Sequence, residues 1–194
     1  MKHLLAVALF FVGIDLVAAP KRPSPEQIRK LMEQTRPGPE HELLAQFAGK
    51  WKLTIKAGAG AQSSGRATSY MTMENRFLWI GYSTDNQQRP FKGSFQIGFD
   101  RRHEMFTVIA MDTSGTYFVT SRGKLDPKTR RARLLGKDDD PFMKSMGYTK
   151  EFAHILDFSR PDRFVITVMF IDTRTPKRTE SKGMELIFER LKTK

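Results

Sequence analysis

The stretch Pro37-Gly-Pro-Glu-His-Glu-Leu-Leu-Ala-Gln-Phe-Ala-Gly-Lys-Trp51 decides the fold of this chain. A short helix is expected from Pro39, because proline suits the first helical position and two glutamates follow at the positive end of the helix dipole. Gly49 ends this helix, since glycine readily adopts the left-handed conformation of a helix terminus. The stretch therefore predicts a helical lid followed directly by the first strand of a β-structure.

Apolar and polar residues alternate after this glycine. Trp51, Leu53 and Ile55 fall on one face, while lysines and a threonine fall on the other. This period of two is typical of a strand with one buried face and one face in water. Alternation of this kind, together with the turn signals between the segments, predicts ten strands. They lie at residues 50–56, 66–73, 77–84, 91–99, 105–112, 116–125, 131–135, 148–158, 164–171 and 184–191.

Turn-forming residues separate these strands, among them Asp85-Asn86, Asp126-Pro127 and Arg160-Pro-Asp162. Gly58 to Gly65 is expected to be a turn of small residues. Many antiparallel strands without intervening helices indicate a sandwich or a barrel, and long strands favour the barrel, because closure removes exposed edges. We therefore predict an all-β fold, an antiparallel up-and-down β-barrel of about ten strands with one or two short N-terminal helices.

The chain has 194 residues, which fits one domain and a targeting segment. Residues 1–19 have a charged start, an apolar middle at Leu4–Val12 and a small-residue end at Ala18-Ala19. This pattern predicts a secretory signal peptide and hence a periplasmic or secreted protein; an uncleaved N-terminal anchor is the alternative. Residues 20–36 are expected to form a proline-rich linker and a short helix, and residues 37–194 the barrel domain.

That short helix has its own start signal. Ser24 is expected to cap it, with Pro25 at the first helical position and Gln27 completing a capping box.

The composition excludes several classes of site. The chain contains no cysteine, so disulfides, zinc–thiolate sites and cysteine nucleophiles are impossible. No hydrolase, metalloprotease or phosphate-loop motif is present. The three aspartates from Asp138 to Asp140 are interpreted as a solvated turn, because Pro141 replaces the continuation that a calcium loop needs. We therefore predict no catalytic residues, no metal ligands and no cofactor.

The net charge of +12 predicts attraction to anionic surfaces. Six basic residues surround one expected hairpin: Lys124, Lys128, Arg130, Arg131, Arg133 and Lys137. They form either a solvated face or a dock for an anionic membrane or envelope glycan. No aromatic residues alternate with them, which argues against a nucleic-acid partner, as does the predicted export.

The opening stretch also resembles a bacterial family called Domain of Unknown Function 1579, which opens on Pro-Gly-Pro-Glu-His, a leucine pair and Gly-x-Trp. Further segments are similar to the family at residues 76–78, 91–93, 97–100, 112–115, 123–129 and 188–190. The resemblance implies a barrel related to lipocalins, fatty-acid-binding proteins and the haem protein nitrobindin. It implies no established activity, so no catalytic residue is carried over.

Four residues are predicted to bind a ligand: Trp51, Phe95, Tyr117 and His154. The alternative, favoured for Trp51, is that the aromatic side chains simply fill the barrel. Phe95 belongs to a period-two aromatic row in residues 91–99, which would form an apolar wall if it faces inward. His154 shares a face of its strand with Tyr148, Phe152, Leu156 and Lys150. If that face is interior, its imidazole would enter the cavity; the alternative is a hydrogen-bonded wall histidine. Aromatic side chains and a few polar tips are the usual composition of a small-molecule site.

Three functions remain open from the sequence. The leading one is an exported lipocalin-like barrel that binds a small, largely apolar ligand. The alternatives are a haem-dependent, nitrobindin-like enzyme using His154 and an envelope interaction protein using the basic hairpin. The strand from Phe164 to Ile171 is apolar on both faces, so we also expect its outer face to be covered by the N-terminal helices or by a dimer partner.

Overall fold

The structure is a computed structural model that describes residues 22–58, 60–86, 88–147, 149–174 and 177–192. The predicted signal peptide lies outside the described residues. The chain divides into two units, residues 1–33 and 34–194. The first unit contains α1 (Pro25–Gln34) except for its last residue. The predicted capping box at the start of this helix is confirmed. Ser24 Oγ accepts a hydrogen bond from the Gln27 backbone N–H at 3.2 Å, and Gln27 Oε1 accepts one from the Ser24 backbone N–H at 2.7 Å.

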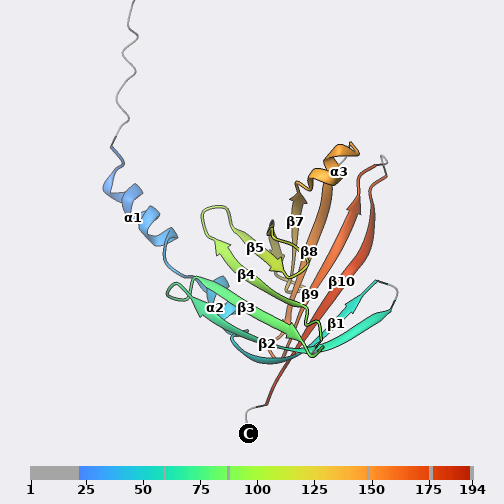
Figure 1. Cartoon of the computed structure of the whole chain (residues 1–194). Helices are drawn as coiled ribbons and strands as arrows, with labels where there is room; N and C mark the ends of the chain where they lie inside the picture. Colours follow the sequence, from blue (N-terminus) through green and yellow to red (C-terminus); the bar gives the residue numbers. More distant parts are fainter. Residues whose placement is uncertain (1–21, 59, 87, 148, 175–176, 193–194) are drawn as a thin grey trace, which may run out of the picture. The chain divides into compact units, whose positions relative to one another are not determined.

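The second unit is a closed barrel of ten antiparallel strands (Figure 1). Each strand pairs with the next in sequence, and the last returns to pair with the first. The strands are β1 (Gly49–Ala57), β2 (Ala61–Thr72), β3 (Phe77–Thr84), β4 (Lys92–Asp100), β5 (Met105–Asp112), β6 (Val119–Asp126), β7 (Arg131–Asp138), β8 (Lys150–Arg160), β9 (Arg163–Asp172) and β10 (Thr179–Arg190). The predicted all-β up-and-down barrel is confirmed.

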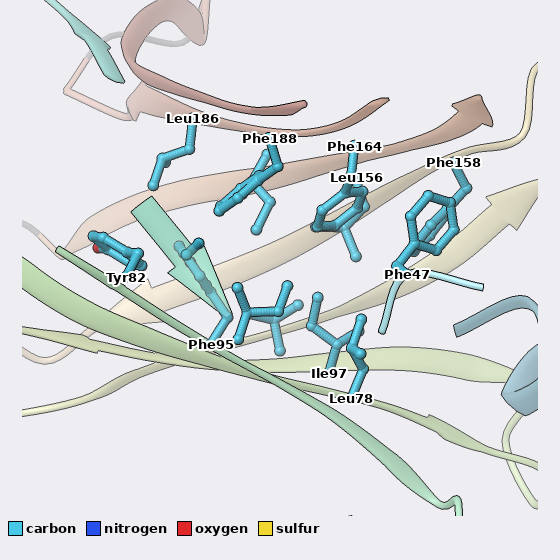
Figure 2. Packing of buried hydrophobic residues seen from close by; sticks show 14 of the residues in the cluster. Phe47, Leu78, Tyr82, Phe95, Ile97, Leu156, Phe158, Phe164, Leu186 and Phe188 are labelled. Carbon is cyan, nitrogen blue, oxygen red and sulfur yellow. The ribbon is translucent and has the colours of Figure 1, made fainter. Parts of the chain in front are cut away.

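Alternation along the strands builds the barrel interior. In β3, for example, Leu78, Ile80 and Tyr82 are buried while their neighbours are more exposed. Successive side chains of a strand point to opposite faces, so every second residue enters the core. Figure 2 shows these core side chains in a row, with Phe47 and Phe158 at one end and Tyr82 and Phe95 at the other.

The predicted lid fills one end of this row. In α2 (Pro39–Ala45), Leu44 is fully buried, and Phe47 follows the helix with its ring 5.4 Å from Phe158 and 5.2 Å from Phe164. The helix packs against β2, β3 and β4. His41 caps it, because its Nδ1 accepts a hydrogen bond from the Gly38 backbone N–H at 3.0 Å. This end of the barrel is therefore closed by apolar packing.

Two predicted boundaries were wrong where the residues are polar or small. β2 begins at Ala61, so the expected turn at 58–65 is shorter, and Gly58 and Gly60 supply its positive φ angles. β10 begins at Thr179, five residues before the predicted 184, and passes a bulge at Gly183. These segments pair through backbone groups and lack the apolar alternation on which the prediction depended.

Three further differences lie near the ends of the central strands. β6 begins at Val119 rather than at 116, and β7 continues to Asp138 rather than ending at 135. The short helix α3 (Pro141–Ser145) was not predicted. Its proline occupies the first helical position after an aspartate, a start signal that was interpreted as a turn.

Part of the outer face of β9 is buried within the single chain. In this single chain Val165, Ile171 and the neighbouring Ile187 of β10 are already buried. Their cover does not come from α2, which packs against the opposite strands β2–β4. Cover of the rest of this face by α1 or by a dimer partner stays a prediction. No helix among the described residues is long and apolar enough to cross a membrane.

Arg190 ties the closed end together. Its guanidinium lies 4.3 Å from the centre of the Trp51 ring, and it donates hydrogen bonds to the carbonyls of Gln46, Ala48 and Pro161. These groups belong to the lid, the start of β1 and the turn between β8 and β9. Trp51 is fixed on its other side, because its Nε1 donates to Ser69 Oγ of β2 at 2.8 Å. One side chain thus joins segments that are far apart in sequence.

We expect Arg190→Lys to destabilise the fold by about 2 kcal/mol, because an ammonium cannot reproduce the planar fork of donors or its stacking on the indole. Urea unfolding followed by tryptophan fluorescence measures this effect. Arg160→Lys is the matched control: Arg160 pairs with Asp162 in the same region but both side chains are exposed, so its unfolding midpoint should barely move. Equal effects of the two substitutions would contradict this role of Arg190.

Candidate functional site

A cavity of about 200 Å³ lies at the end of the barrel opposite the lid. It is formed where β3, β5, β7 and β9 end and where β4, β6 and β8 begin. Its walls are mostly aromatic and aliphatic, with contributions from Tyr82, Phe95, Met111, Tyr117, Phe152, Val168, Phe170 and Met184. The polar groups among its lining residues include Asp112, Asp138, Lys150 and His154.

His154 is the buried polar group of this cavity. It lies on β8 between Phe152 and Leu156 of the same inward face, and only 2% of its surface is exposed. Its Nδ1 is 2.8 Å from Ser121 Oγ, a buried hydroxyl on β6. Gly136 lies between these strands on β7, and a Cβ there would lie 2.3 Å from the Phe152 ring, so the glycine makes room for the aromatic wall.

The imidazole of His154 is neutral at neutral pH. Burial lowers its pKa from 6.5 to about 4, because a charged ring would lose its hydration. Aromatic rings surround it: Phe152 lies 5.2 Å away and Phe95 6.1 Å away, both in edge-to-face geometry. A neutral imidazole can serve as a hydrogen-bond donor at one nitrogen and an acceptor at the other.

The second ring nitrogen, Nε2, is open to the cavity. Among the described residues the His154 imidazole has no hydrogen bond other than that to Ser121. That part of the chain also contains no fully enclosed side-chain nitrogen or oxygen without a partner. Nε2 therefore reaches free space. It is a donor if Ser121 donates to Nδ1, and an acceptor if Nδ1 donates to Ser121.

Tyr82 supplies a second polar tip. Its ring is stacked on Phe95 with 5.7 Å between centroids, and its hydroxyl lies over Gly93, where an added Cβ would be 2.3 Å from Oη. Burial, and then the negative charge of Asp112, raise the pKa of Tyr82, so the phenol stays protonated. Tyr82 was not among the predicted ligand-binding residues, although it shares a period-two pattern with the buried Leu78 and Ile80.

Charged residues lie at the rim of the cavity. Asp138 of β7 and Lys150 of β8 are opposite each other in register and form an ion pair of 3.3 Å, with the Lys150 ammonium 5.7 Å from the centre of the Phe170 ring. Asp112 at the end of β5 accepts hydrogen bonds from the backbone N–H and the hydroxyl of Ser114. Within the described residues Asp112 forms no ion pair.

The structure brings together three of the four predicted ligand-binding residues. Phe95 and His154 line the inner part of the cavity, and Tyr117 lies at its rim with 56% of its surface exposed. Trp51 is not among the lining residues, because it lies at the closed end beside Phe47. Binding by these residues stays a prediction.

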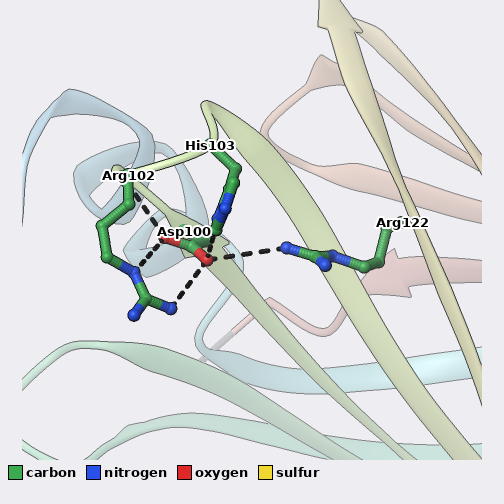
Figure 3. Close-up of polar contacts among 4 residues, drawn as sticks. All are labelled: Asp100, Arg102, His103 and Arg122. Carbon is green, nitrogen blue, oxygen red and sulfur yellow. Dashed lines mark hydrogen bonds and ion pairs between the residues drawn. The ribbon is translucent and has the colours of Figure 1, made fainter. Parts of the chain in front are cut away.

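Two other charged clusters lie on the outer surface of the barrel. Figure 3 shows Asp100 of the β4–β5 turn between Arg102, His103 and Arg122. Hydrogen bonds from Arg102 and then His103 hold the pKa of Asp100 well below its ordinary value. The carboxylate is saturated by these neighbours and faces solvent, which is typical of a stabilised turn.

The predicted basic hairpin is the other cluster. Arg131 and Arg133 point outward as expected, since Ala132 and Leu134 between them are fully buried. Arg131 pairs with Asp157 and Arg133 with Glu180, so part of the positive charge is compensated. Binding of this hairpin to an anionic surface stays a prediction. In the part of the chain that the structure describes, no group of three or more acidic or histidine side chains is arranged to hold a metal ion.

Comparison with known proteins identifies the family. Residues 36–190 match the family described as Protein of unknown function (DUF1579), which is most of the chain. The chain belongs to this family. No curated protein gives a significant match.

Two solved structures are similar to this DUF1579 protein at a low level. One is a redesigned β-barrel, with 12% sequence identity, a TM-score of 0.42 and coverage of 77% of this chain and 96% of the other. The second is EF1p2_mFAP2b bound to DFHBI, with 10% identity, a TM-score of 0.42 and coverage of 78% and 98%. Neither similarity informs the function.

The burial of His154 makes stability depend on pH. The pKa of this imidazole is 6.5 in the unfolded chain and about 4 in the folded protein. Because the folded-state pKa is the lower one, the unfolded state binds more protons below pH 6.5, and stability is lost as the pH falls from about 6.5 toward 4. At about 1.36 kcal/mol per pKa unit, roughly 2 kcal/mol should be lost between about pH 7.5 and pH 5.

Urea unfolding of the wild type and of His154→Gln at these two pH values isolates this contribution, since all other titrating groups are shared. We expect the wild type to lose roughly 2 kcal/mol more than the variant on acidification. Parallel losses in the two proteins would show that His154 is protonated as easily in the folded state as in the unfolded chain.

Proposed function

We propose that this DUF1579 protein binds a small, largely apolar molecule in the open end of its barrel. The observation that carries the proposal is His154, whose Nε2 is open to an aromatic-walled cavity although the side chain is buried. An apolar wall with a few fixed polar groups is the usual form of a small-molecule site. His154 and the Tyr82 hydroxyl would give the ligand its orientation.

The closed end of the same barrel provides an internal comparison. There Phe47, Phe158 and Phe164 pack ring against ring, and the polar tip of Trp51 is bonded to Ser69. The open end has the opposite character, because neither Nε2 of His154 nor Oη of Tyr82 has a hydrogen-bond partner among the described residues. Simple filling of a barrel by aromatic side chains accounts for the first arrangement but not for the second.

The size of the cavity limits the ligand. Its volume of about 200 Å³ lies below the range of about 300–1,000 Å³ found for pockets that hold drug-sized molecules. A single ring or a short branched chain is therefore favoured, with any larger part of the molecule extending past Tyr117 at the rim.

The haem-dependent alternative fits the cavity poorly. Nε2 of His154 is a suitable iron ligand, and Ser121 would orient the ring through Nδ1. However, a porphyrin needs a wide slot on one side of the histidine, whereas Phe95 and Phe152 place their rings 6.1 Å and 5.2 Å from the imidazole, and the cavity measures about 200 Å³. The residues present therefore favour a smaller organic ligand.

Phe95→Trp tests the binding proposal. The larger indole would crowd the inner wall, so we expect the affinity for a small hydrophobic dye, measured by fluorescence titration, to fall by at least about tenfold. Phe118→Trp is the matched control, because Phe118 is 63% exposed and does not line the cavity. Urea unfolding of both variants checks that they remain folded.

Two results would overturn the proposal: a wild-type protein that binds no apolar probe, or equal binding by Phe95→Trp and wild type. Haem added under the same conditions should leave the Soret band at its free position. A Soret shift that disappears in His154→Ala would instead support the haem-dependent alternative. Native mass spectrometry of protein purified from its own host would reveal a bound natural ligand as added mass.

We further propose that the protein acts after export, on the basis of the signal-peptide pattern in residues 1–19. N-terminal sequencing of protein from fractionated cells should find a mature chain that begins at Ala19 or Pro20. Intact protein that retains Met1 in the cytosol would refute export, without affecting the proposed binding site.

A further inference from the structure

The charges around the cavity are unbalanced. Besides Tyr117, a phenol at the rim, five titratable side chains line it: Tyr82, Asp112, Asp138, Lys150 and His154. Tyr82 and His154 are neutral, because burial raises the pKa of the phenol and lowers that of the imidazole. The Lys150 ammonium is compensated by Asp138 at 3.3 Å. The carboxylate of Asp112 remains, so the cavity carries one net negative charge.

This negative charge reaches into the cavity. After burial, the second cause of the raised pKa of Tyr82 is the charge of Asp112. The Asp112 carboxylate is held in place by Ser114, whose backbone N–H donates to it at 2.8 Å, so it is fixed at the rim. Because Lys150 already has a carboxylate partner, the described cavity offers no uncompensated cation to receive an anionic ligand. A ligand carboxylate would lose hydration and meet net repulsion.

The walls favour the opposite charge. The faces of aromatic rings attract cations, and a ligand ammonium is bound well where several rings surround it near a carboxylate. Phe95, Tyr82 and Tyr117 line the side of the cavity that carries Asp112. The cavity wall already contains one such contact, since the Lys150 ammonium lies over the ring of Phe170 at 5.7 Å.

We propose that the cavity selects small organic cations, namely primary amines that carry one aromatic ring or a short apolar body. The ligand ammonium binds Asp112 at the rim beside Tyr117, and the apolar body lies against Phe95 and Phe152. A hydroxyl or carbonyl at the far end of the ligand then meets Nε2 of His154. This inference depends on the proposed binding function and adds the charge class of the ligand.

Three probes of nearly equal size and shape test the charge preference: 2-phenylethylammonium, 2-phenylethanol and phenylacetate, each titrated into the full-length mature protein by calorimetry at low salt. We expect the ammonium to bind at least about tenfold more tightly than the carboxylate, with the alcohol between them. Added salt should reduce the difference in affinity between the ammonium and the carboxylate, since part of that difference comes from a charge at the rim.

Asp112→Asn assigns the effect, because asparagine keeps an acceptor for Ser114 but loses the charge. It should weaken binding of the ammonium about tenfold and leave binding of the alcohol unchanged. Asp139→Asn is the matched control: Asp139 is exposed at the same end of the barrel, pairs with Lys144 and does not line the cavity. Lys150→Gln should strengthen binding of the ammonium, because it releases Asp138 from its partner.

The outcomes separate this inference from the function on which it depends. If the hydrophobic dye and all three probes fail to bind, the binding function itself is refuted. If the dye binds but phenylacetate binds more tightly than the ammonium, or if Asp112→Asn weakens the alcohol and the ammonium equally, the cavity remains a binding site and the preference for cations is wrong.

Discussion

The contact between Arg190 and Trp51 is the constraint on which the rest of the barrel depends. The tryptophan opens the first strand and the arginine ends the last, and the two residues are opposite each other in the pairing of β1 with β10. A closed barrel needs this pairing, since every other pairing among the described strands joins neighbours in sequence. The guanidinium also donates to the carbonyls that lead from the lid into β1, so the same side chain holds both the closing strand pair and the lid.

The two ends of the barrel differ in packing: the lid closes one end, and the cavity lies at the other. Phe47 and the large rings around it fill the barrel beside the lid, and the filling continues through Leu78 and Ile97. Since the strands run up and down, their other ends meet at the opposite rim, where the described residues leave a cavity of about 200 Å³. The inward positions there include Asp138 and Lys150, which a sealed core would not tolerate without further partners. The asymmetry between the two ends thus follows from the position of one lid.

Much of this arrangement was predictable, because period-two alternation needs only local sequence. The strands at 77–84 and 105–112 were placed at their observed bounds, and Phe95 and His154 at the inward face. Long-range facts were not predictable: the pairing of His154 with Ser121 depends on a strand lying between them, and the separation of Trp51 from the cavity depends on where the lid packs. Polar strand ends such as Thr179 to Gly183 carry no periodic signal, so their pairing was missed.

The pair of His154 and Ser121 is hard to explain as a device for stability. Burying an imidazole and a hydroxyl costs hydration, and one mutual hydrogen bond offsets only part of that cost. Apolar residues of similar size at the two positions would extend the core that Phe95 and Phe152 already form. The fold instead retains a polar pair whose hydrogen bond fixes the ring through Nδ1 and turns Nε2 toward free space. Sequences depart from the rules of core packing mainly at functional sites. Ser121 and His154 are the most deeply buried polar side chains among the described residues, with 2% of each exposed.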